Sequence, residues 1–256
     1  MEGVQIIGSL DFATLLFIAF VAFFIGLVFY LQRESRREGY PLETETTGKV
    51  EPGGDTWLPR PKTYLQADGT VVTKPDMRRD PGNDKLKRLA VWPGAPSEPV
   101  GDPMTANVGP GAYTLRDDIA DVTHEGEPKI VPMRLLPEFT VAKQTADPRG
   151  FDVVGCDGEI AGKITDIWMD RAEALVRYYE VELADASRKV LLPYAFANVK
   201  GKARQVRVSA VTARHFADVP AHASPEKITR LEEDRISAYY GGGILYATPK
   251  KLEPWI

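Results

Sequence analysis

The longest hydrophobic run in the chain extends from Phe12 to Leu31 and contains no charged residue. A helix needs about 20 apolar residues to cross the roughly 30 Å hydrocarbon core of a bilayer. The run therefore predicts one transmembrane helix over residues 12–31, with a short segment, 1–11, on the far side of the membrane. The helix can continue to about Glu38, where a glycine and then a proline end it.

A secretory signal peptide is the alternative interpretation of this run. The preceding residues carry only acidic charge, and "YLQRESRREGY" follows in place of a small-residue cleavage site, so the pattern favours a permanent anchor. Arg33, Arg36 and Arg37 follow the helix while no basic residue precedes it, which predicts a periplasmic N-terminus and a cytoplasmic C-terminal part. With Tyr30 and Tyr40, these arginines are candidates for contact with lipid headgroups or a partner.

From about Lys129 the pattern changes to short apolar–polar alternations separated by turn residues. Such spacing is typical of a small β-barrel or sandwich, so a mainly β domain is predicted over residues 129–250. The candidate strands are Ile130–Leu135, Phe139–Lys143, Asp152–Val154, Glu159–Met169, Leu175–Leu183, Arg188–Pro193, Ala197–Lys200 and Gln205–Val208.

The two longest candidate strands enclose a turn near residues 171–174, and alternation assigns each side chain to a face. The expected cross-strand pairs are Asp170 with Leu175, Trp168 with Arg177, and Asp166 with Tyr179. The shared face is apolar far from the turn and charged at the tip. Asp170, Glu173 and Arg177 are therefore expected within a few ångströms of one another.

Two interpretations of this charged tip remain open. It is either a solvated rim held by exposed salt bridges or a surface that a partner covers. Burial and a neighbouring carboxylate raise a carboxyl pKa while an arginine lowers it, so a covered cluster of this kind could relay protons.

Helical spacing returns near the C-terminus and predicts a helix over about 232–247, because acidic residues favour a helix start. Ile228 and Arg230 fit a last strand before it. Gly241, Gly242 and Gly243 cost about 1 kcal/mol each in helix propensity. The helix either stops there or continues because the glycines permit close packing. A phosphate-binding loop would need a following lysine and Ser/Thr, which are absent.

Residues 39–128 are rich in proline and glycine and hold over half of the chain's 20 prolines. Such a segment is either a disordered tether or an extended strap lying on a partner. Its apolar residues favour the strap: Trp57, Tyr64, Leu65, Leu86, Leu89, Val91 and Trp92. One hairpin is predicted in "KTYLQADGTVV", around Asp68-Gly69.

Composition narrows the possible chemistry. A net charge of −4 argues against a general nucleic-acid binder. The single cysteine, Cys156, excludes an internal disulfide and is a weak candidate for a nucleophile. His124, His215 and His222 have no partners at metal-ligand spacing. Without a catalytic motif, neither an enzyme nor a chain-bound cofactor is expected.

Four segments in order resemble the H subunit of the purple-bacterial photosynthetic reaction centre: "LQRESRREGYPLE", "GDPMTANVGPGAY", "GCDGEIAGKITDIWMD" and "LEEDRISAYYGGGILYA". The part from about Lys129 resembles a PRC-barrel domain. The resemblance implies a pigment-free structural subunit of the bacterial inner (intracytoplasmic) membrane. Its helix would pack beside the L and M subunits, and its barrel would cap them on the quinone side. In that family L and M carry bacteriochlorophyll, bacteriopheophytin, quinones and a non-haem iron.

The resemblance also implies a part in delivering protons to the secondary quinone. Residues matching Asp170 and Glu173 belong to that route in the family, and the residue matching Arg177 belongs to the same cluster. The family's surface entry uses two histidines and an aspartate, whereas the loop here has one histidine, His124, with Asp121 nearby. Proton uptake through carboxylates remains an expectation, while the zinc or cadmium site of the histidine pair is in doubt.

Further partners that come with the resemblance are an antenna complex, a cytochrome subunit and membrane lipids. The alternative function is a membrane-tethered PRC-barrel adaptor that recruits a soluble partner. An anchored enzyme is a third reading, without a motif to support it.

Overall fold

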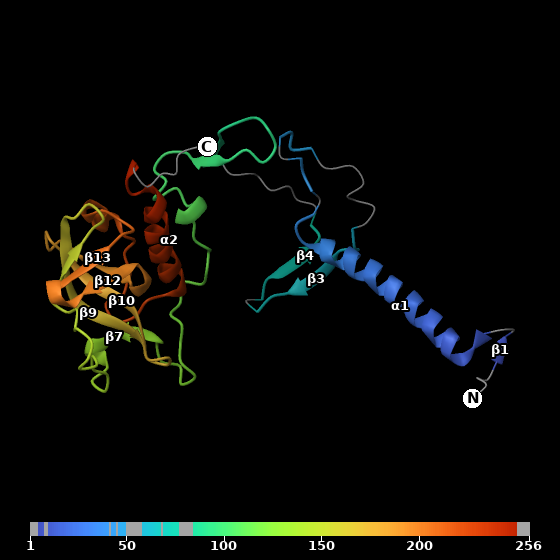
Figure 1. Cartoon of the computed structure of the whole chain (residues 1–256), viewed down its shortest axis with the longest axis horizontal. Coiled ribbons are helices and arrows are strands. Elements are labelled where there is room, and N and C mark those ends of the chain that lie inside the picture. Colours follow the sequence, from blue (N-terminus) through green and yellow to red (C-terminus); the bar gives the residue numbers. More distant parts are fainter. Residues whose placement is uncertain are drawn as a thin grey trace. The chain divides into compact units, whose positions relative to one another are not determined.

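The computed structural model describes residues 5–7, 10–40, 42–44, 46–49, 58–67, 69–76 and 84–249, and structural statements below concern these residues. The chain divides into two compact units, one of Met1–Asn83 with Arg88–Pro96 and one of Asp84–Lys87 with Ser97–Ile256. Figure 1 shows their elements, and each unit is described by itself.

The first unit is built on one long helix, α1 (Phe12–Glu34), which follows the short strands β1 (Gln5–Ile7) and β2 (Leu10–Asp11). The Asp11 carboxylate caps α1 by accepting from the backbone N–H of Thr14 at 2.8 Å. No residue of α1 is buried by the rest of the chain, and its mean hydropathy reaches 2.8. A helix that is apolar on all sides needs lipid or a partner around it, so the predicted single-span anchor fits.

A hairpin packs at the end of α1, beyond the 3₁₀ turn Ser35–Arg37. Its strands are β3 (Lys62–Leu65) and β4 (Val71–Lys74), paired antiparallel as the sequence predicted; Asp68 of the expected turn lies outside the described residues. Arg37 holds the hairpin to the helix, since its guanidinium donates to the carbonyls of Arg60 and Lys74 at 2.9 and 3.0 Å.

The second unit contains a seven-stranded sheet in the hydrogen-bonded order β11-β10-β9-β8-β13-β12, with β7 beside β9. The strands are β7 (Ile130–Pro132), β8 (Asp152–Val154), β9 (Ile160–Asp170), β10 (Leu175–Leu183), β11 (Lys189–Pro193), β12 (Ala197–Lys200) and β13 (Gln205–Val208). Neighbours are antiparallel except β8 and β13. A separate ribbon consists of β5 (Leu86–Arg88) and β6 (Ser97–Pro99), and α2 (Arg230–Tyr246) ends the fold.

One apolar core unites this sheet with α2. Fully buried members come from most strands and from the helix: Val153, Ile164, Val181, Leu191, Val206, Ile236 and Tyr240. The predicted fold class is therefore confirmed as an N-terminal apolar helix, a mainly β domain and one C-terminal helix. The hydrogen-bonded order leaves β7, β11 and β12 with one neighbouring strand each, so within the described residues the sheet is not closed into a full barrel.

Two predicted strands are wrong. Residues 139–143 run between two turns instead, in which Phe139 N–H bonds back to Leu136 and Thr145 N–H bonds back to Ala142. Phe139 and Val141 still pack against the core, which accounts for their apolar character. The expected last strand at Ile228 and Arg230 reduces to a single bridge between Ala120 and Thr229, because α2 already begins at Arg230.

The β9–β10 hairpin follows the expected register at both ends and departs from it in the middle. Asp170 pairs with Leu175, as predicted, and Ile164 pairs with Val181, which continues the same register. Between them, irregularities at Arg177 and Thr165 shift the pairing by one residue, so the expected partners of Trp168 and Asp166 are wrong. Trp168 pairs with Tyr178 and Asp166 pairs with Glu180. Each such bulge inserts one unpaired residue and turns the following side chains to the other face.

The glycines of α2 lie where another part of the unit comes close. A methyl group on Gly243 would be 2.4 Å from Val211 Cγ1 and 2.7 Å from the carbonyl oxygen of Ala210, and one on Gly242 would be 3.1 Å from the Cα of Gly111. The helix therefore continues through the glycines, because close packing against residues 111 and 210–211 offsets their low propensity.

We expect Gly243→Ala to lower the free energy of unfolding by about 1–2 kcal/mol. The added methyl group pushes residues 210–211 away from α2. The cost of this displacement outweighs the gain in helix propensity of about 1 kcal/mol. Urea unfolding of the detergent-solubilised chain, followed by near-ultraviolet circular dichroism, measures this. Gly241→Ala is the matched control, since its methyl group would meet only the Pro110 oxygen at 3.2 Å. Equal stability of the two variants would contradict the packing argument.

Candidate functional site

Asp170 ends β9 and is almost completely buried, at 2% exposed. Its carboxylate accepts from the backbone N–H groups of Ala172 and Glu173, both at 3.0 Å, and lies 3.2 Å from the Lys129 ammonium. A buried carboxylate needs such donors, because desolvation otherwise disfavours its charge. The tight turn at residues 171–174 supplies two of the three.

Lys129 joins Asp170 to Glu173. Its ammonium is 2.9 Å from Glu173 Oε1, and the Glu173 side chain is about half exposed, at 53%. The hydrogen bonds to Glu173 and then Asp170 raise the pKa of Lys129, so this cation stays charged between the two acids. The arrangement places one buried and one solvent-accessible carboxylate on a single ammonium group.

Arg177 sits at the β10 bulge, and its ion-pair partner is Glu233 of α2 at 3.4 Å. The cation between Asp170 and Glu173 is therefore Lys129, in the place that sequence reasoning gave to Arg177. Alternation along β10 put Arg177 on the same face as Tyr179 and Val181, and the bulge removes it from that face.

Glu233 was not anticipated as a functional residue, only as part of an acidic helix start. Its side chain is 16% exposed, and it accepts from the Tyr178 hydroxyl at 2.9 Å. Burial raises the pKa of Glu233, while Tyr178 and Arg177 oppose the rise. Its spacing of three and seven residues from the buried Ile236 and Tyr240 was the available sign that it faces inward.

The two remaining predicted site residues lie on the loop before β7. Asp121 pairs with Arg230 at 2.8 Å, and this hydrogen bond lowers the pKa of Asp121. The Asp121 carbonyl also accepts from the backbone N–H of Lys129 at 2.8 Å, which ties the loop to the hairpin tip. His124 is highly exposed, with its Nε2 3.6 Å from Glu125.

These contacts define a surface charged cluster. Its members are Asp121, Lys129, Asp170, Glu173, Arg177, Arg230 and Glu233. It extends from the β9–β10 tip to the first turns of α2. Glu233 also experiences the charge of Asp121, so protonation at one position affects the others.

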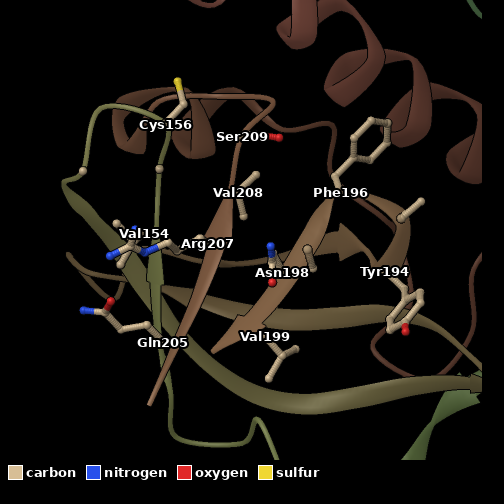
Figure 2. Close-up of a pocket in the computed structure, with 14 residues that line it drawn as sticks. Val154, Cys156, Tyr194, Phe196, Asn198, Val199, Gln205, Arg207, Val208 and Ser209 are labelled. Atoms are coloured by element: carbon tan, nitrogen blue, oxygen red, sulfur yellow. The ribbon is translucent and has the colours of Figure 1, made fainter. Parts of the chain in front are cut away.

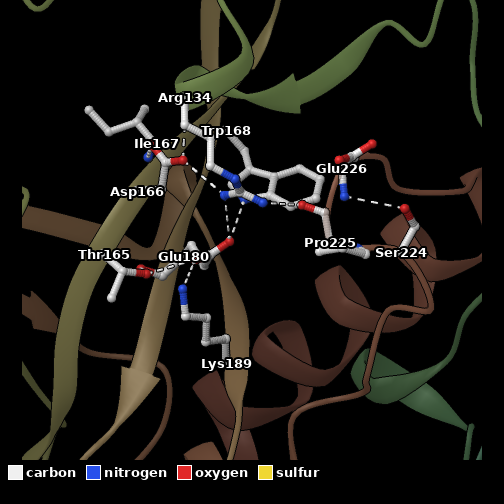
Figure 3. Close-up of polar contacts among 10 residues, drawn as sticks. All are labelled: Arg134, Thr165, Asp166, Ile167, Trp168, Glu180, Lys189, Ser224, Pro225 and Glu226. Atoms are coloured by element: carbon white, nitrogen blue, oxygen red, sulfur yellow. Dashed lines mark hydrogen bonds and ion pairs between the residues drawn. The ribbon is translucent and has the colours of Figure 1, made fainter.

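A second group of charges, shown in Figure 3, is the buried ionic network between β9 and β10. Arg134 Nη1 lies 2.9 Å from Asp166 and 3.2 Å from Glu180, and its Nη2 donates to the Pro225 carbonyl. Glu180 also accepts from Lys189, Thr165 and the Trp168 indole, at 2.7, 2.8 and 3.2 Å.

Both carboxylates of this network are deeply buried, at 5% for Asp166 and 3% for Glu180. Burial by itself would raise the pKa of Glu180, but the hydrogen bonds from Lys189, Thr165 and Trp168 prevail and lower it to about 2. Glu180 is therefore a structural anion, and its partner Arg134 links the β9–β10 hairpin to the loop that carries Pro225.

The candidate lipid contacts differ in how far their groups are engaged. The Arg37 guanidinium holds two carbonyls and both oxygens of Glu34, and Arg33 donates to the Leu58 carbonyl at 3.3 Å. Arg36 lies 5.4 Å from the centre of the Tyr40 ring, a cation–π distance, and Tyr30 is 55% exposed on α1.

The described residues contain no group of three His, Cys, Asp or Glu side chains arranged to hold a metal ion.

The fold defines a class of protein: a chain with one N-terminal apolar helix long enough to span a membrane and a mainly β domain that carries the surface charged cluster. Two protein-family models match this chain. Residues 4–135 match the photosynthetic reaction centre H-chain N-terminal region, and residues 142–215 match the PRC-barrel domain. The chain belongs to the reaction-centre H-chain family.

Membership makes this chain a structural subunit of a photosynthetic reaction centre. It associates with other subunits of that complex, and the pigments lie on those partner subunits. The apolar helix α1 fits a single-pass anchor in the membrane that holds the complex.

We expect Glu180→Gln to lower the free energy of unfolding by about 2–3 kcal/mol at neutral pH, because each unit of pKa depression corresponds to about 1.4 kcal/mol. A carboxylate whose folded pKa is depressed stabilises the fold above its unfolded pKa of 4.5 and loses this as pH falls towards 2. The difference between wild type and variant should therefore shrink across that window, as measured by urea unfolding at several pH values.

Glu182→Gln is the control for this experiment, since Glu182 is an exposed carboxylate on the same strand. It should leave stability within about 0.5 kcal/mol of wild type. A Glu180→Gln variant whose deficit persists unchanged at pH 2–3 would show that loss of charge is not the cause.

Proposed function

We propose that this chain caps the membrane-spanning partner subunits on their quinone side and helps to deliver protons to the secondary quinone. The observation that carries the proposal is the pair of carboxylates on Lys129, one buried (Asp170) and one open to water (Glu173). A proton route needs one group that exchanges protons with solvent and a second group that is buried in the protein. The resemblance of the same positions to the family's proton route supports this reading.

Within the surface charged cluster the groups differ in what they can do. Asp121, whose pKa is lowered, stays ionised and attracts protons to the surface, together with the exposed His124. Glu173 is accessible to water and hands protons to the buried Asp170. Glu233, whose pKa burial raises, can hold a proton at higher pH than an ordinary carboxyl group. Lys129, Arg177 and Arg230 keep the clustered acids from repelling one another.

Exposed apolar side chains support a partner-covered strap over residues 39–128. In the described part, Leu65, Val91 and Trp92 are 77%, 92% and 60% exposed; Trp57 lies outside it. Large side chains exposed to this extent are typical of an interaction surface. We place residues 1–11 in the periplasm and the β domain, 129–250, in the cytoplasm, since Arg33, Arg36 and Arg37 follow the helix.

The reaction chemistry belongs to the partners in this proposal: bacteriochlorophyll, bacteriopheophytin, quinones and a non-haem iron. This chain supplies positioned side chains and a water-excluding cover. Arg36 and Tyr40 take an anionic lipid headgroup where α1 leaves the membrane, with Tyr30 at the interface. Antenna and cytochrome subunits are further partners of the assembled complex.

We expect Glu173→Gln to slow the proton-coupled second electron transfer to the quinone by about tenfold to a hundredfold, because a positioned proton-transfer group is lost. Primary charge separation should be unchanged, since this chain holds no pigment. Flash kinetics on the purified reaction centre measure both steps, across neutral and alkaline pH.

Glu182→Gln serves as control, because it removes an equally solvent-exposed charge from β10 outside the cluster. If the rate of the second electron transfer in Glu173→Gln matches that of the control over the whole pH range, the proton-delivery role is contradicted.

We expect removal of residues 1–31 to prevent stable assembly. The deleted part includes nearly all of α1, whose apolar surface is unburied within the chain and should pack against lipid and partner helices. Co-purification of the truncated chain with the other subunits measures this, and its near-infrared spectrum reports bound complex. Full retention of the truncated chain would contradict the role of α1 in assembly.

A further inference from the structure

A concave surface that shares no residue with the surface charged cluster lies on the outer side of β12 and β13. Figure 2 shows it as a trough with Arg207 and Gln205 on one side, Tyr194 on the other and Asn198 between. Its volume is about 900 Å³. Asn198 and Arg207 are direct cross-strand partners and are exposed, while Val206 and Val208 of the same strand point into the core. Alternation along β13 therefore directs a row of polar side chains into the trough.

The trough is positively charged and contains no acidic side chain. None of its lining residues is an aspartate or glutamate, and Arg207 is the charged one. The neighbouring Asp157 turns its carboxylate to the backbone N–H of Ala213, with both oxygens at 3.2 Å. A carboxylate that approached the lining residues would meet amide donors and the Arg207 cation, and none of these residues is an anion.

The turn after β12 extends this positive charge. The sequence "KGKARQVR" places Lys200, Lys202, Arg204 and Arg207 within eight residues, and all four are exposed. Arg204 lies over the Phe151 ring at 5.0 Å, whereas Lys200 is the cross-strand partner of Gln205, which lines the trough. In a chain of net charge −4 this is a local reversal of sign.

The backbone beside the trough is also open. β12 is the last strand in the sheet order, so within the described residues one of its edges has no strand partner. A free edge next to a side-chain pocket is the arrangement by which an extended peptide adds to a sheet, with alternate side chains read by the pocket. The amide side chains of Asn198 and Gln205 both donate and accept hydrogen bonds, as a peptide backbone does, whereas the oxygens of a phosphate group only accept.

We propose that this trough binds an acidic protein segment in extended conformation, which pairs along the edge of β12 and directs its carboxylates to Arg207, Lys200 and Lys202. The surface is separate from the proton-delivery cluster, so the proposal stands independently of that function. It gives the reaction-centre subunit a docking site for a second, soluble or peripheral protein.

The chain carries its own reporter for the test. Cys156 is its single cysteine, is exposed and lines the trough. A fluorescent maleimide on Cys156 of the full-length, detergent-solubilised chain is titrated with a synthetic peptide of alternating glutamate and valine. The peptide is about six residues long, as an ordinary strand is. We expect a saturable change in fluorescence that weakens as salt screens the charges.

Arg207→Gln and Lys200→Gln should each weaken peptide binding by about threefold to fivefold, as expected for one exposed ion pair. Lys227→Gln, which removes an exposed cation from a distant loop, is the matched control and should bind as wild type does. Glu173→Gln should also bind unchanged, which separates this result from the outcome for proton delivery.

Several outcomes would overturn the proposal. These are no response to the acidic peptide, an equal response to a lysine–valine peptide, or equal weakening in Lys227→Gln. Binding only to phosphatidylglycerol vesicles or to a single-stranded oligonucleotide would assign the trough to a different ligand. Failure of the maleimide to reach Cys156 in the assembled reaction centre would assign this surface to the other subunits.

Discussion

The pairing of Asp166 with Glu180 is the constraint on which the β domain depends. Two bulges, at Arg177 and Thr165, shift the middle of the β9–β10 hairpin by one residue and bring these buried carboxylates directly opposite each other. Like charges in such positions would destabilise the sheet. Arg134 lies against both and Lys189 contacts Glu180, so the excess negative charge is compensated. The same guanidinium reaches the Pro225 carbonyl and ties a distant loop to the sheet.

The same register shift produces the surface charged cluster. With the bulge at Arg177, Tyr178 takes the position opposite Trp168 and its hydroxyl reaches Glu233 on α2. Arg177 leaves the face that alternation gave it and pairs with the same glutamate. A regular hairpin would have put Arg177 opposite Trp168. The bulge at Arg177 thus separates two groups of charges. The buried network holds a carboxylate with a lowered pKa, and the surface charged cluster holds acids whose pKa values are shifted in opposite directions.

The two groups of charges differ in their surroundings, and this decides their roles. Glu180 has three hydrogen-bond donors besides Arg134, and its depressed pKa keeps it ionised at any physiological pH. Glu173 is half exposed with one ammonium partner, and Glu233 is partly buried with an elevated pKa. Glu180 therefore contributes to stability as a fixed charge, whereas the surface charged cluster includes acids that remain in contact with water.

Much of this protein was determined by local sequence. The transmembrane helix, the mainly β domain, most strands and the C-terminal helix follow from hydrophobic period and length, because these depend on neighbours along the chain. Asp170 and Glu173 at the hairpin tip also follow from alternation and turn position. The tertiary structure alone decided which side chains pair with these charged residues. Lys129, Glu233 and Arg134 come from remote segments. The shifted register directs Arg177 and Tyr178 to α2 and Glu180 to Arg134. Residues 139–143 keep an apolar pattern without a strand, since Phe139 and Val141 pack against the core from between two turns. Periodicity encodes which side chains face inward, but contacts between distant segments fix which groups then meet.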